Sequence, residues 1–200
     1  MYEILLSNVF SLGLVALLIV FMSPAARAAL PVVVAVLAVL ATWGLTVSDG
    51  ATLLPPTYSN PWLWVHVGFG KPFLGFLLVA TGLAVTIVWR FAVAGTATDT
   101  SARVATLWRC FSTSFVFESL MLIAGAVWAR DAWGRYWQWD PLETWAFLTW
   151  VLAAMVLHLR ATRRIPEVVA VGGVVVVFTV AFMTFFGFPY LSPAPHKGAV

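Results

Sequence analysis

Six apolar runs divide this 200-residue chain, and each is close to the roughly 20 residues that an α-helix needs to cross a bilayer. They cover residues 4–22, 30–48, 72–94, 110–129, 141–159 and 167–188. A membrane β-strand needs only about 9 to 11 residues, so the runs are too long for a barrel. Hydrophobic residues make up 62% of the chain and charged residues 10%, which no soluble domain could carry on its surface. The sequence predicts an all-α, polytopic membrane bundle of six transmembrane helices.

Small residues follow the first run, as they would at a signal-peptide cleavage site. A signal peptide carries basic residues ahead of a shorter apolar core, whereas Glu3 is the only charge before this run. We therefore expect residues 4–22 to form the first helix of the bundle.

The basic residues of the loops predict sidedness, because cytoplasmic loops carry the excess of Lys and Arg. Seven fall on one side: Arg27, Arg90, Arg103, Arg109, Arg160, Arg163 and Arg164. Four fall on the other: Lys71, Arg130, Arg135 and Lys197. With six spans, both termini and the loops 49–66 and 130–140 are expected outside. The expected location is the plasma membrane of a prokaryote or an equivalent organelle membrane.

Tryptophan is concentrated in residues 128–150, WARDAWGRYWQWDPLETWAFLTW, which hold six of the 11 tryptophans of the chain. Tryptophan suits the bilayer interface, and it also suits the face of a flat aromatic ligand. An interfacial belt needs only a few such residues, so this density favours a platform. Trp137 and Trp139 are two residues apart, and an extended approach would place them on one face.

The segment that follows has the pattern of a helix start, with Asp140 as the N-cap, Pro141 at the first helical position and Glu143 three residues after the cap. Capping alone explains both acids. A role in orienting a ligand can coexist with it, because the cap also fixes the direction of Trp137, Trp139 and Trp145.

Two of the three histidines, His66 and His196, fall on the same predicted side as the tryptophans. Two imidazoles facing each other could ligate a haem iron, with tryptophans covering the porphyrin. Taken singly, each is also explained as an interfacial histidine bonded to water. His158 lies near the inner end of the fifth helix, where the helix dipole favours it.

Haem carries two propionates, so cations are expected near its rim. The candidates are Lys71, Arg130, Arg135 and Lys197. Lipid headgroups would explain any one of them equally well. Glu118 lies near the middle of the fourth helix, where a carboxylate is costly, and could act as a relay or pair with a hydroxyl such as that of Thr81. The single cysteine, Cys110, excludes disulfides and thiolate clusters within the chain, and no hydrolase or phosphate-loop motif is present.

Residues 133–160, WGRYWQWDPLETWAFLTWVLAAMVLHLR, are similar to the WWD signature of the haem-handling cytochrome c assembly proteins, in the WGxYWxWDPxETW form of CcsA (ResC) of System II and of CcmF. The segments PPTYSNPWLWVHV and FFGFPYLSPAPHKG resemble those that carry the two external histidines of this family. The resemblance covers residues 54–198. It divides the chain into two N-terminal transmembrane helices, 1–53, and a WWD-type core with four, 54–200.

The resemblance implies that His66 and His196 axially ligate haem b at an outer site. The implied platform comprises Trp133, Trp137, Trp139, Asp140 and Trp145. His158 would belong to an inner haem site whose other ligand comes from a CcsB (ResB) partner. The pair would move haem outward and join it to the CXXCH thiols of an apocytochrome c, as part of a holocytochrome c synthase (haem lyase). The implied partners are the CcsB-like protein, the apocytochrome c and membrane lipid, and no nucleic-acid partner is expected.

Three alternatives stay open. CcmC, a haem-delivery subunit of System I, is similarly short, but its motif usually lacks the DPxETW ending found here. This chain also departs from the CcsA pattern in two ways. CcsA proteins often have more spans, and they more often show LHSYG where His196 stands in APHKG. A haem-binding redox or sensory protein without a ligation role, and a transporter of another aromatic substrate, are the two further classes. Whether catalysis resides in this chain is also left open.

Overall fold

The computed structural model describes residues 2–47, 59–94 and 101–187, and all regular structure within these ranges is helical. Six helical segments have the length and apolar composition to cross a membrane. In chain order the elements are α1 (Tyr2–Met22), the short 3-10 helix η1 (Pro24–Ala29), α2 (Leu30–Thr46), α3 (Pro61–Ala94), α4 (Ser101–Trp133), α5 (Pro141–Ala161), α6 (Glu167–Phe182) and the π-helical turn η3 (Met183–Gly187). The prediction of an all-α bundle with six spanning helices is confirmed.

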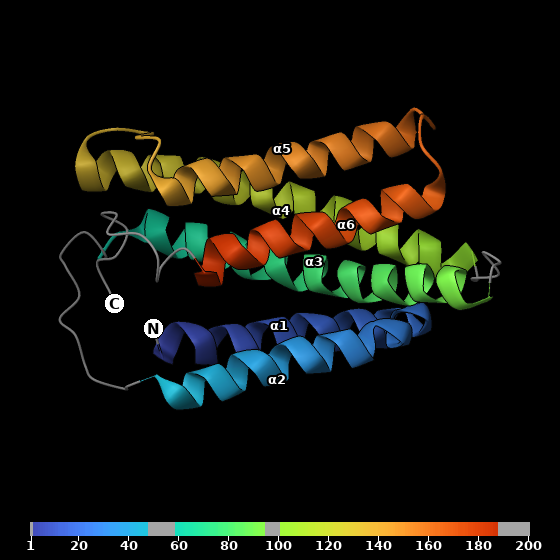
Figure 1. Cartoon of the computed structure of the whole chain (residues 1–200). Helices are drawn as coiled ribbons and strands as arrows, with labels where there is room; N and C mark the ends of the chain where they lie inside the picture. Colours follow the sequence, from blue (N-terminus) through green and yellow to red (C-terminus); the bar gives the residue numbers. More distant parts are fainter. Residues whose placement is uncertain (1, 48–58, 95–100, 188–200) are drawn as a thin grey trace.

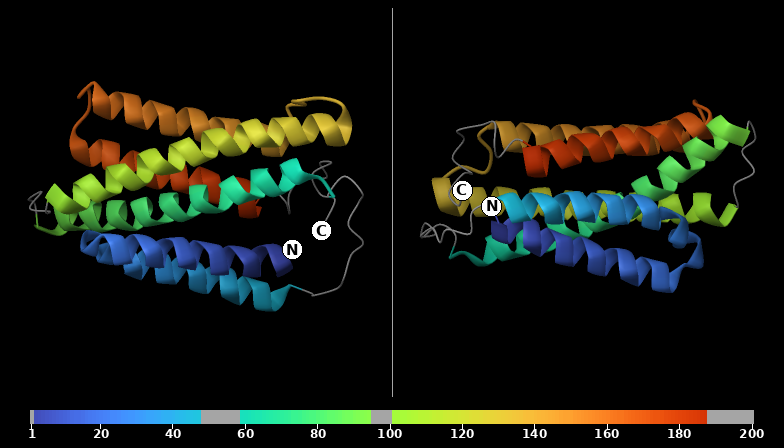
Figure 2. Two further views of the ribbon diagram at one scale, coloured as in Figure 1. Left: turned by 180° about the vertical axis from the view of Figure 1, so that it is seen from behind. Right: turned by 60° about the horizontal axis from the view of Figure 1, so that its bottom comes forward.

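Helix α3 is the centre of the bundle (Figures 1 and 2). It packs most extensively against α4 and also contacts α1, α2, η1 and α6, whereas α5 lies against α4 and α6. Every residue from Phe73 to Ala84 is buried except the half-buried Phe76. A helix that is apolar on all sides can be buried in this way, because each of its faces finds a neighbouring helix.

The N-terminal helices approach α3 closely through small residues. A β-carbon at Gly82 would lie 2.7 Å from Cβ of Ala29 in η1. One turn further along α3, the hydroxyl of Thr86 donates a hydrogen bond to the carbonyl of Ala28 at 2.9 Å. Small residues allow this approach of two backbones, and the polar bond adds direction to it.

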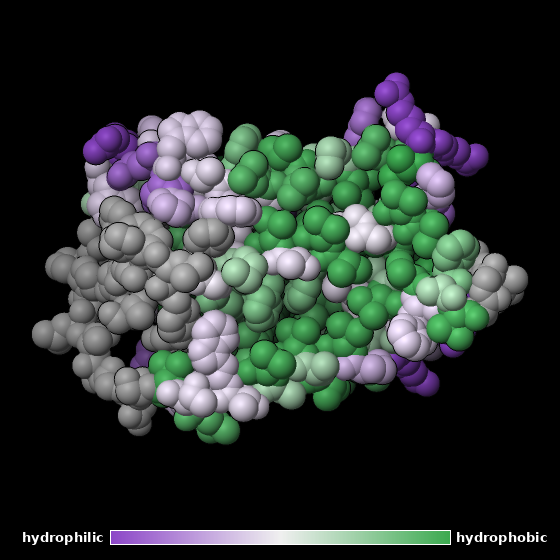
Figure 3. Space-filling view, in the orientation of Figure 1, coloured by the Kyte–Doolittle hydropathy of each residue, from purple (hydrophilic) through white to green (hydrophobic). Residues whose placement is uncertain are grey.

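The sides of the bundle are apolar, as lipid contact requires. Figure 3 shows hydrophobic residues across the middle of the molecule and hydrophilic residues gathered toward its two ends. Large apolar side chains are exposed on these sides, among them Phe10, Leu17, Phe21, Val34 and Ile123. The few exposed polar side chains within the spans include Thr179, whose hydroxyl is satisfied inside its own helix by the carbonyl of Val175 at 2.9 Å, as lipid contact requires.

The start of α3 corrects one sequence-based prediction. The third helix was expected from residue 72, after a loop at 49–66, but α3 already begins at Pro61. Asn60 caps it, because its Oδ1 accepts a hydrogen bond from the backbone N–H of Trp62 at 2.8 Å. Pro61 follows at the first helical position, where its missing N–H costs nothing. Pro72 therefore lies inside the helix, where membrane proteins tolerate proline.

Helix α4 is also longer than its apolar run of residues 110–129. It begins at Ser101, so the polar and basic stretch before Cys110 is helical in part. Two polar contacts hold this extension. The hydroxyls of Thr106 and Ser23 lie 3.2 Å apart, and the indole N–H of Trp108 donates to Oε1 of Glu167 at 2.5 Å.

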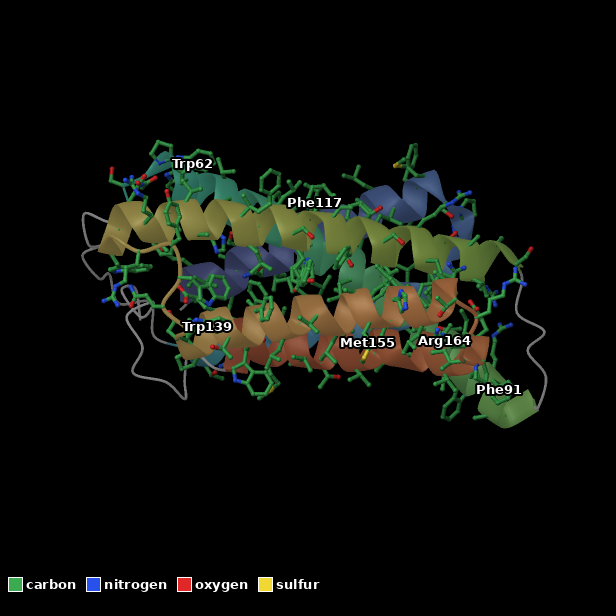
Figure 4. All side chains as sticks on the ribbon, turned by 90° about the horizontal axis from the view of Figure 1, so that it is seen from above. Trp62, Phe91, Phe117, Trp139, Met155 and Arg164 are labelled. Carbon is green, nitrogen blue, oxygen red and sulfur yellow. The ribbon has the colours of Figure 1, made fainter. Side chains whose placement is uncertain are left out.

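The bundle has two chemically different ends. Figure 4 places Trp62 and Trp139 at one end and Phe91 and Arg164 at the other. We call the first the tryptophan end; the start of α3, the α4–α5 loop and the start of α1 lie there. We call the second the arginine end, where η1 and the turn between α5 and α6 lie.

Candidate functional site

His66 lies near the start of α3, at the tryptophan end, and its ring is fixed by α4. Its Nδ1 lies 2.9 Å from the backbone carbonyl oxygen of Met121. A carbonyl can only accept a hydrogen bond, so Nδ1 must carry the proton. The neutral ring then has its lone pair on Nε2, which is the form of histidine that ligates a metal.

Helix α4 also shapes the space around this ring. Gly125 is one turn along from Met121, and a β-carbon there would lie only 2.7 Å from Nδ1 of His66. On the next turn the indole of Trp128 stacks on the imidazole, with ring centroids 6.2 Å apart and planes inclined by 21°. Trp133 then meets Trp128 edge to face at 4.8 Å. Helix α4 thus fixes the His66 ring in three ways. The Met121 carbonyl accepts its hydrogen bond, Gly125 leaves room for it, and Trp128 stacks on its face.

The start of α5 is capped as the sequence predicted. Oδ1 of Asp140 accepts a hydrogen bond from the backbone N–H of Glu143 at 2.9 Å. The Glu143 carboxylate reaches back to the backbone N–H of Gln138 at 2.7 Å, two residues further than in the simple capping box. The two acids therefore fix the approach to α5 as well as its first turn.

The approach itself is not extended, and that expectation was wrong. Trp139 has φ of +59°, in the left-handed region that a bulky residue rarely adopts. Despite this backbone conformation, the rings of Trp139 and Trp137 meet edge to face, with centroids 5.7 Å apart and planes inclined by 80°. Both rings also meet Phe147 of α5 edge to face, at 6.3 and 6.1 Å.

Aromatic contacts continue from this group toward the middle of the bundle. Phe147 stacks with Trp150 at 6.1 Å, and Trp150 stacks with Phe115 of α4 at 5.5 Å. The indole N–H of Trp150 donates to the hydroxyl of Ser119 at 2.9 Å. By contrast, the indole N–H of Trp137 is buried and has no hydrogen-bond acceptor among the described residues.

The predicted cations differ in their surroundings. Arg130 lies at the end of α4, 3.7 Å from the Asp131 carboxylate and 5.8 Å from the centroid of the Tyr136 ring. Arg135 is exposed in the loop. Lys71 instead points toward α1, where its ammonium donates to the hydroxyl of Ser7 at 2.5 Å.

Of the remaining candidates, the structure describes His158 and Glu118. His158 is exposed at the arginine end, four residues before Thr162, whose hydroxyl donates to its carbonyl at 2.9 Å. Glu118 is 1% exposed, and neither carboxylate oxygen has a hydrogen-bond partner in the described part of the chain. His196 and Lys197 lie outside the described residues. Within the described ranges, no group of three or more His, Cys, Asp or Glu side chains could hold a metal ion alone.

Comparison with known proteins supplies the family. The family model described as "Cytochrome C assembly protein" matches residues 1–196, nearly the whole chain. This chain belongs to that family. Membership implies that the protein handles haem, and the residues at the tryptophan end suit haem: an imidazole protonated on Nδ1, aromatic faces beside it, and a buried indole N–H at Trp137.

The curated relatives are named cytochrome c biogenesis protein CcsA. The proteins from Calycanthus floridus var. glaucus and Coffea arabica are each 40% identical to this chain, over 94 and 95 residues. The protein from Trachelium caeruleum is 39% identical over 94 residues. These matches cover 45%, 44% and 45% of this chain, in the same order, and only 28% of each relative. No solved structure matches the chain.

The sequence pointed to His66 but not to the groups that fix it. Met121 acts through its backbone carbonyl, which carries no side-chain signal, and Gly125 is one glycine among 14. Trp128 belongs to the tryptophan-rich segment, but its stacking on His66 depends on the register between α3 and α4. The spacing Gly125-x-x-Trp128 is the one local signal, since it places both residues on the same face of a helix.

Proposed function

We propose that this protein binds haem b at the tryptophan end and presents it for covalent attachment to an apocytochrome c. The observation that carries the proposal is the hydrogen bond from Nδ1 of His66 to the Met121 carbonyl. A backbone carbonyl is a typical outer partner of a metal-ligating histidine, because it fixes the tautomer and the ring orientation. Family membership supplies the process in which such a histidine would act.

Each group at this end has a proposed role. His66 is one axial ligand, and His196 is the proposed second. Asp140 holds the loop that positions the platform, formed by Trp133, Trp137, Trp139 and Trp145. Bound haem supplies the vinyl groups that react with the CXXCH thiols, while the residues of this chain hold and orient it.

For the haem propionates we favour Arg130 and Arg135 over Lys71. Both arginines lie in or beside the tryptophan-rich loop, and a guanidinium matches a carboxylate with two parallel hydrogen bonds. Arg130 has a partner of its own, the Asp131 carboxylate at 3.7 Å, but this pair lies beside the loop, whereas Lys71 points away from it and donates to Ser7 of α1.

An inner haem site is the second part of the proposal. His158 and His66 lie at opposite ends of the bundle, so they cannot ligate one iron. His158 is exposed, which suits a ligand shared with a second protein. We propose a CcsB (ResB)-like partner as the source of the other ligand, in a complex that moves haem outward. The residues 54–200 would form the haem-handling core, and the tryptophan end would face outside.

The absorption spectrum of the detergent-purified protein tests the outer site. Wild type is expected to carry six-coordinate b-type haem. His66→Ala and His196→Ala should each lose it, and added imidazole should restore it by replacing the missing ligand. Far-UV circular dichroism and thermal unfolding check that each variant is folded. A folded wild type that binds no haem, alone or with its partner co-expressed, would exclude the proposal.

Attachment is tested separately. The chain is co-expressed with a CcsB-like partner and an apocytochrome carrying CXXCH, and covalent haem is detected on the denatured cytochrome. Covalent product that depends on His66 and on the partner supports a synthase subunit. Haem binding without any product supports a haem-binding protein with no ligation role.

A further inference from the structure

A cleft lies at the arginine end, where α5 stops and α6 starts. It has a volume of about 500 Å³ and is lined by Arg160, Ala161, Arg163, Ile165 and Glu167. Two guanidinium groups therefore border one concave site, with the apolar side chains of Ala161 and Ile165 beside them.

One wall of the cleft is held by contacts with α4 and α6. The guanidinium of Arg160 lies over the Trp108 ring, 4.3 Å from the centroid, and its Nε is 3.7 Å from Oε1 of Glu167. The same Oε1 accepts the indole N–H of Trp108 at 2.5 Å. Nε of Arg160 is buried and makes no hydrogen bond to any described residue. An arginine stacked on an aromatic ring loses little freedom when it binds an anion, which favours binding.

The other wall is formed by a residue in a rare conformation. Arg163 has φ of +51°, in the left-handed region, where a residue with a long side chain is uncommon. The charged residues that line the cleft are Arg160, Arg163 and the single acid Glu167, and Arg164 adds a further positive charge beside it. The cleft is therefore basic, and its ligand is expected to be an anion.

The cleft is separate from the face of α5 that carries His158. Arg160 follows His158 by two residues, which is a rotation of about 200° around an α-helix. Arg160 faces α4 through Trp108, whereas the His158 side chain is exposed. The His158 side chain and the Arg160 guanidinium therefore point to different sides of α5.

We propose that this cleft binds the phosphate headgroup of an anionic phospholipid. It lies at the end of two lipid-facing helices, at the depth where headgroups gather, and basic pockets between such helices are suited to acidic lipids. Guanidinium groups bind phosphate oxygens through charge-assisted hydrogen bonds. Ala161 and Ile165 can contact the glycerol and the first carbons of the acyl chains.

Native mass spectrometry of the detergent-purified, haem-free protein with added phosphatidylglycerol tests the proposal. Wild type is expected to retain one phosphatidylglycerol and to discriminate against phosphatidylcholine. Arg163→Gln should lower the affinity about tenfold, the effect of losing one charge-assisted contact. Arg164→Gln removes the same charge from the next residue, which does not line the cleft, and should change the affinity less than about twofold.

Two further measurements identify the ligand. Glycerol phosphate should compete only weakly with the lipid, because it lacks the acyl chains. If the cleft were a site for free phosphate, glycerol phosphate would bind with the same affinity as the lipid. Equal effects of Arg163→Gln and Arg164→Gln would mean general attraction to a basic surface, and would overturn the proposal. Displacement of the lipid by added haem would also overturn the proposal. Unchanged thermal unfolding without lipid confirms that both variants are folded, and none of these outcomes bears on His66.

Discussion

Gly125 leaves the space that the His66 ring occupies, and it gives the first prediction at the scale of single residues. The methyl group of Gly125→Ala would lie 2.7 Å from Nδ1 of His66, closer than such atoms can approach. The imidazole must move away from the Met121 carbonyl. We expect haem affinity to fall about 10- to 100-fold, as it does when an outer partner of a metal ligand is lost. Haem titration followed by absorbance measures it.

Gly68→Ala is the matched control, two residues from His66 on α3. A β-carbon at Gly68 would have no atom within 4 Å, so the substitution adds a methyl group without displacing anything. Haem affinity should stay at the wild-type value, while the helix is stabilised by up to about 1 kcal/mol. Equal haem affinity in Gly125→Ala and wild type would show that the ring position does not govern binding.

Glu118 gives a prediction on stability. Its carboxylate is 1% exposed, and neither oxygen has a partner in the described residues. Methionine has a similar volume and no polar atom, so Glu118→Met removes a desolvation cost. We expect the free energy of unfolding to rise by about 1 to 3 kcal/mol, as measured by denaturation in detergent. A loss of stability would instead reveal a polar partner of Glu118 within the folded protein.

At the scale of elements, the α5 N-terminus combines capping with the position of the tryptophan loop. Asp140→Ala removes the acceptor for the Glu143 N–H and should lower the free energy of unfolding by about 1 kcal/mol. Asp140→Asn keeps an oxygen acceptor and should remain near wild type. Thermal unfolding of the two variants distinguishes the effect of the capping hydrogen bond from the effect of the carboxylate charge. If Asp140→Asn is stable yet binds no haem, the carboxylate charge has a role beyond capping.

The sequence predicted the helices well because apolar length is a local property of the chain. It also predicted the α5 cap, whose four residues are consecutive. Hydrophobicity predicts too late a start for α3, because the helix begins at the equally local Asn60-Pro61 start signal, ahead of the apolar run. The left-handed Trp139 could not be predicted from its residue type, since bulky side chains disfavour that conformation.

The environment of His66 depends on pairing between helices far apart in the sequence. Its contacts with Met121 and Gly125 join residues more than 50 positions apart, and they follow from the register of α3 on α4. Apolar helix faces allow many registers, so no local pattern fixes this one. Lys71 shows the same limit, because its bond to Ser7 depends on how α1 packs on α3.

At the scale of the whole molecule, the two ends are related by the membrane that the bundle crosses. Seven of the 11 basic residues belong to segments at the arginine end, which predicts that this end is cytoplasmic. The only cysteine, Cys110, is 4% exposed and should react little with external reagents. The wild-type chain should therefore give little signal in a thiol-labelling experiment, and single introduced cysteines can report on which side of the membrane each end lies.

In a Cys110→Ala background, Tyr136→Cys marks the tryptophan end and Arg164→Cys marks the arginine end. Tyr136 is 58% exposed and Arg164 is also exposed, so both thiols should be reachable. A membrane-impermeant maleimide should label Tyr136→Cys in intact cells, and Arg164→Cys only after the membrane is opened. The reverse pattern would place the tryptophan end in the cytoplasm. Haem bound at His66 would then lie on the wrong side to meet an exported apocytochrome, so this labelling decides whether presentation on the outer face is physically possible.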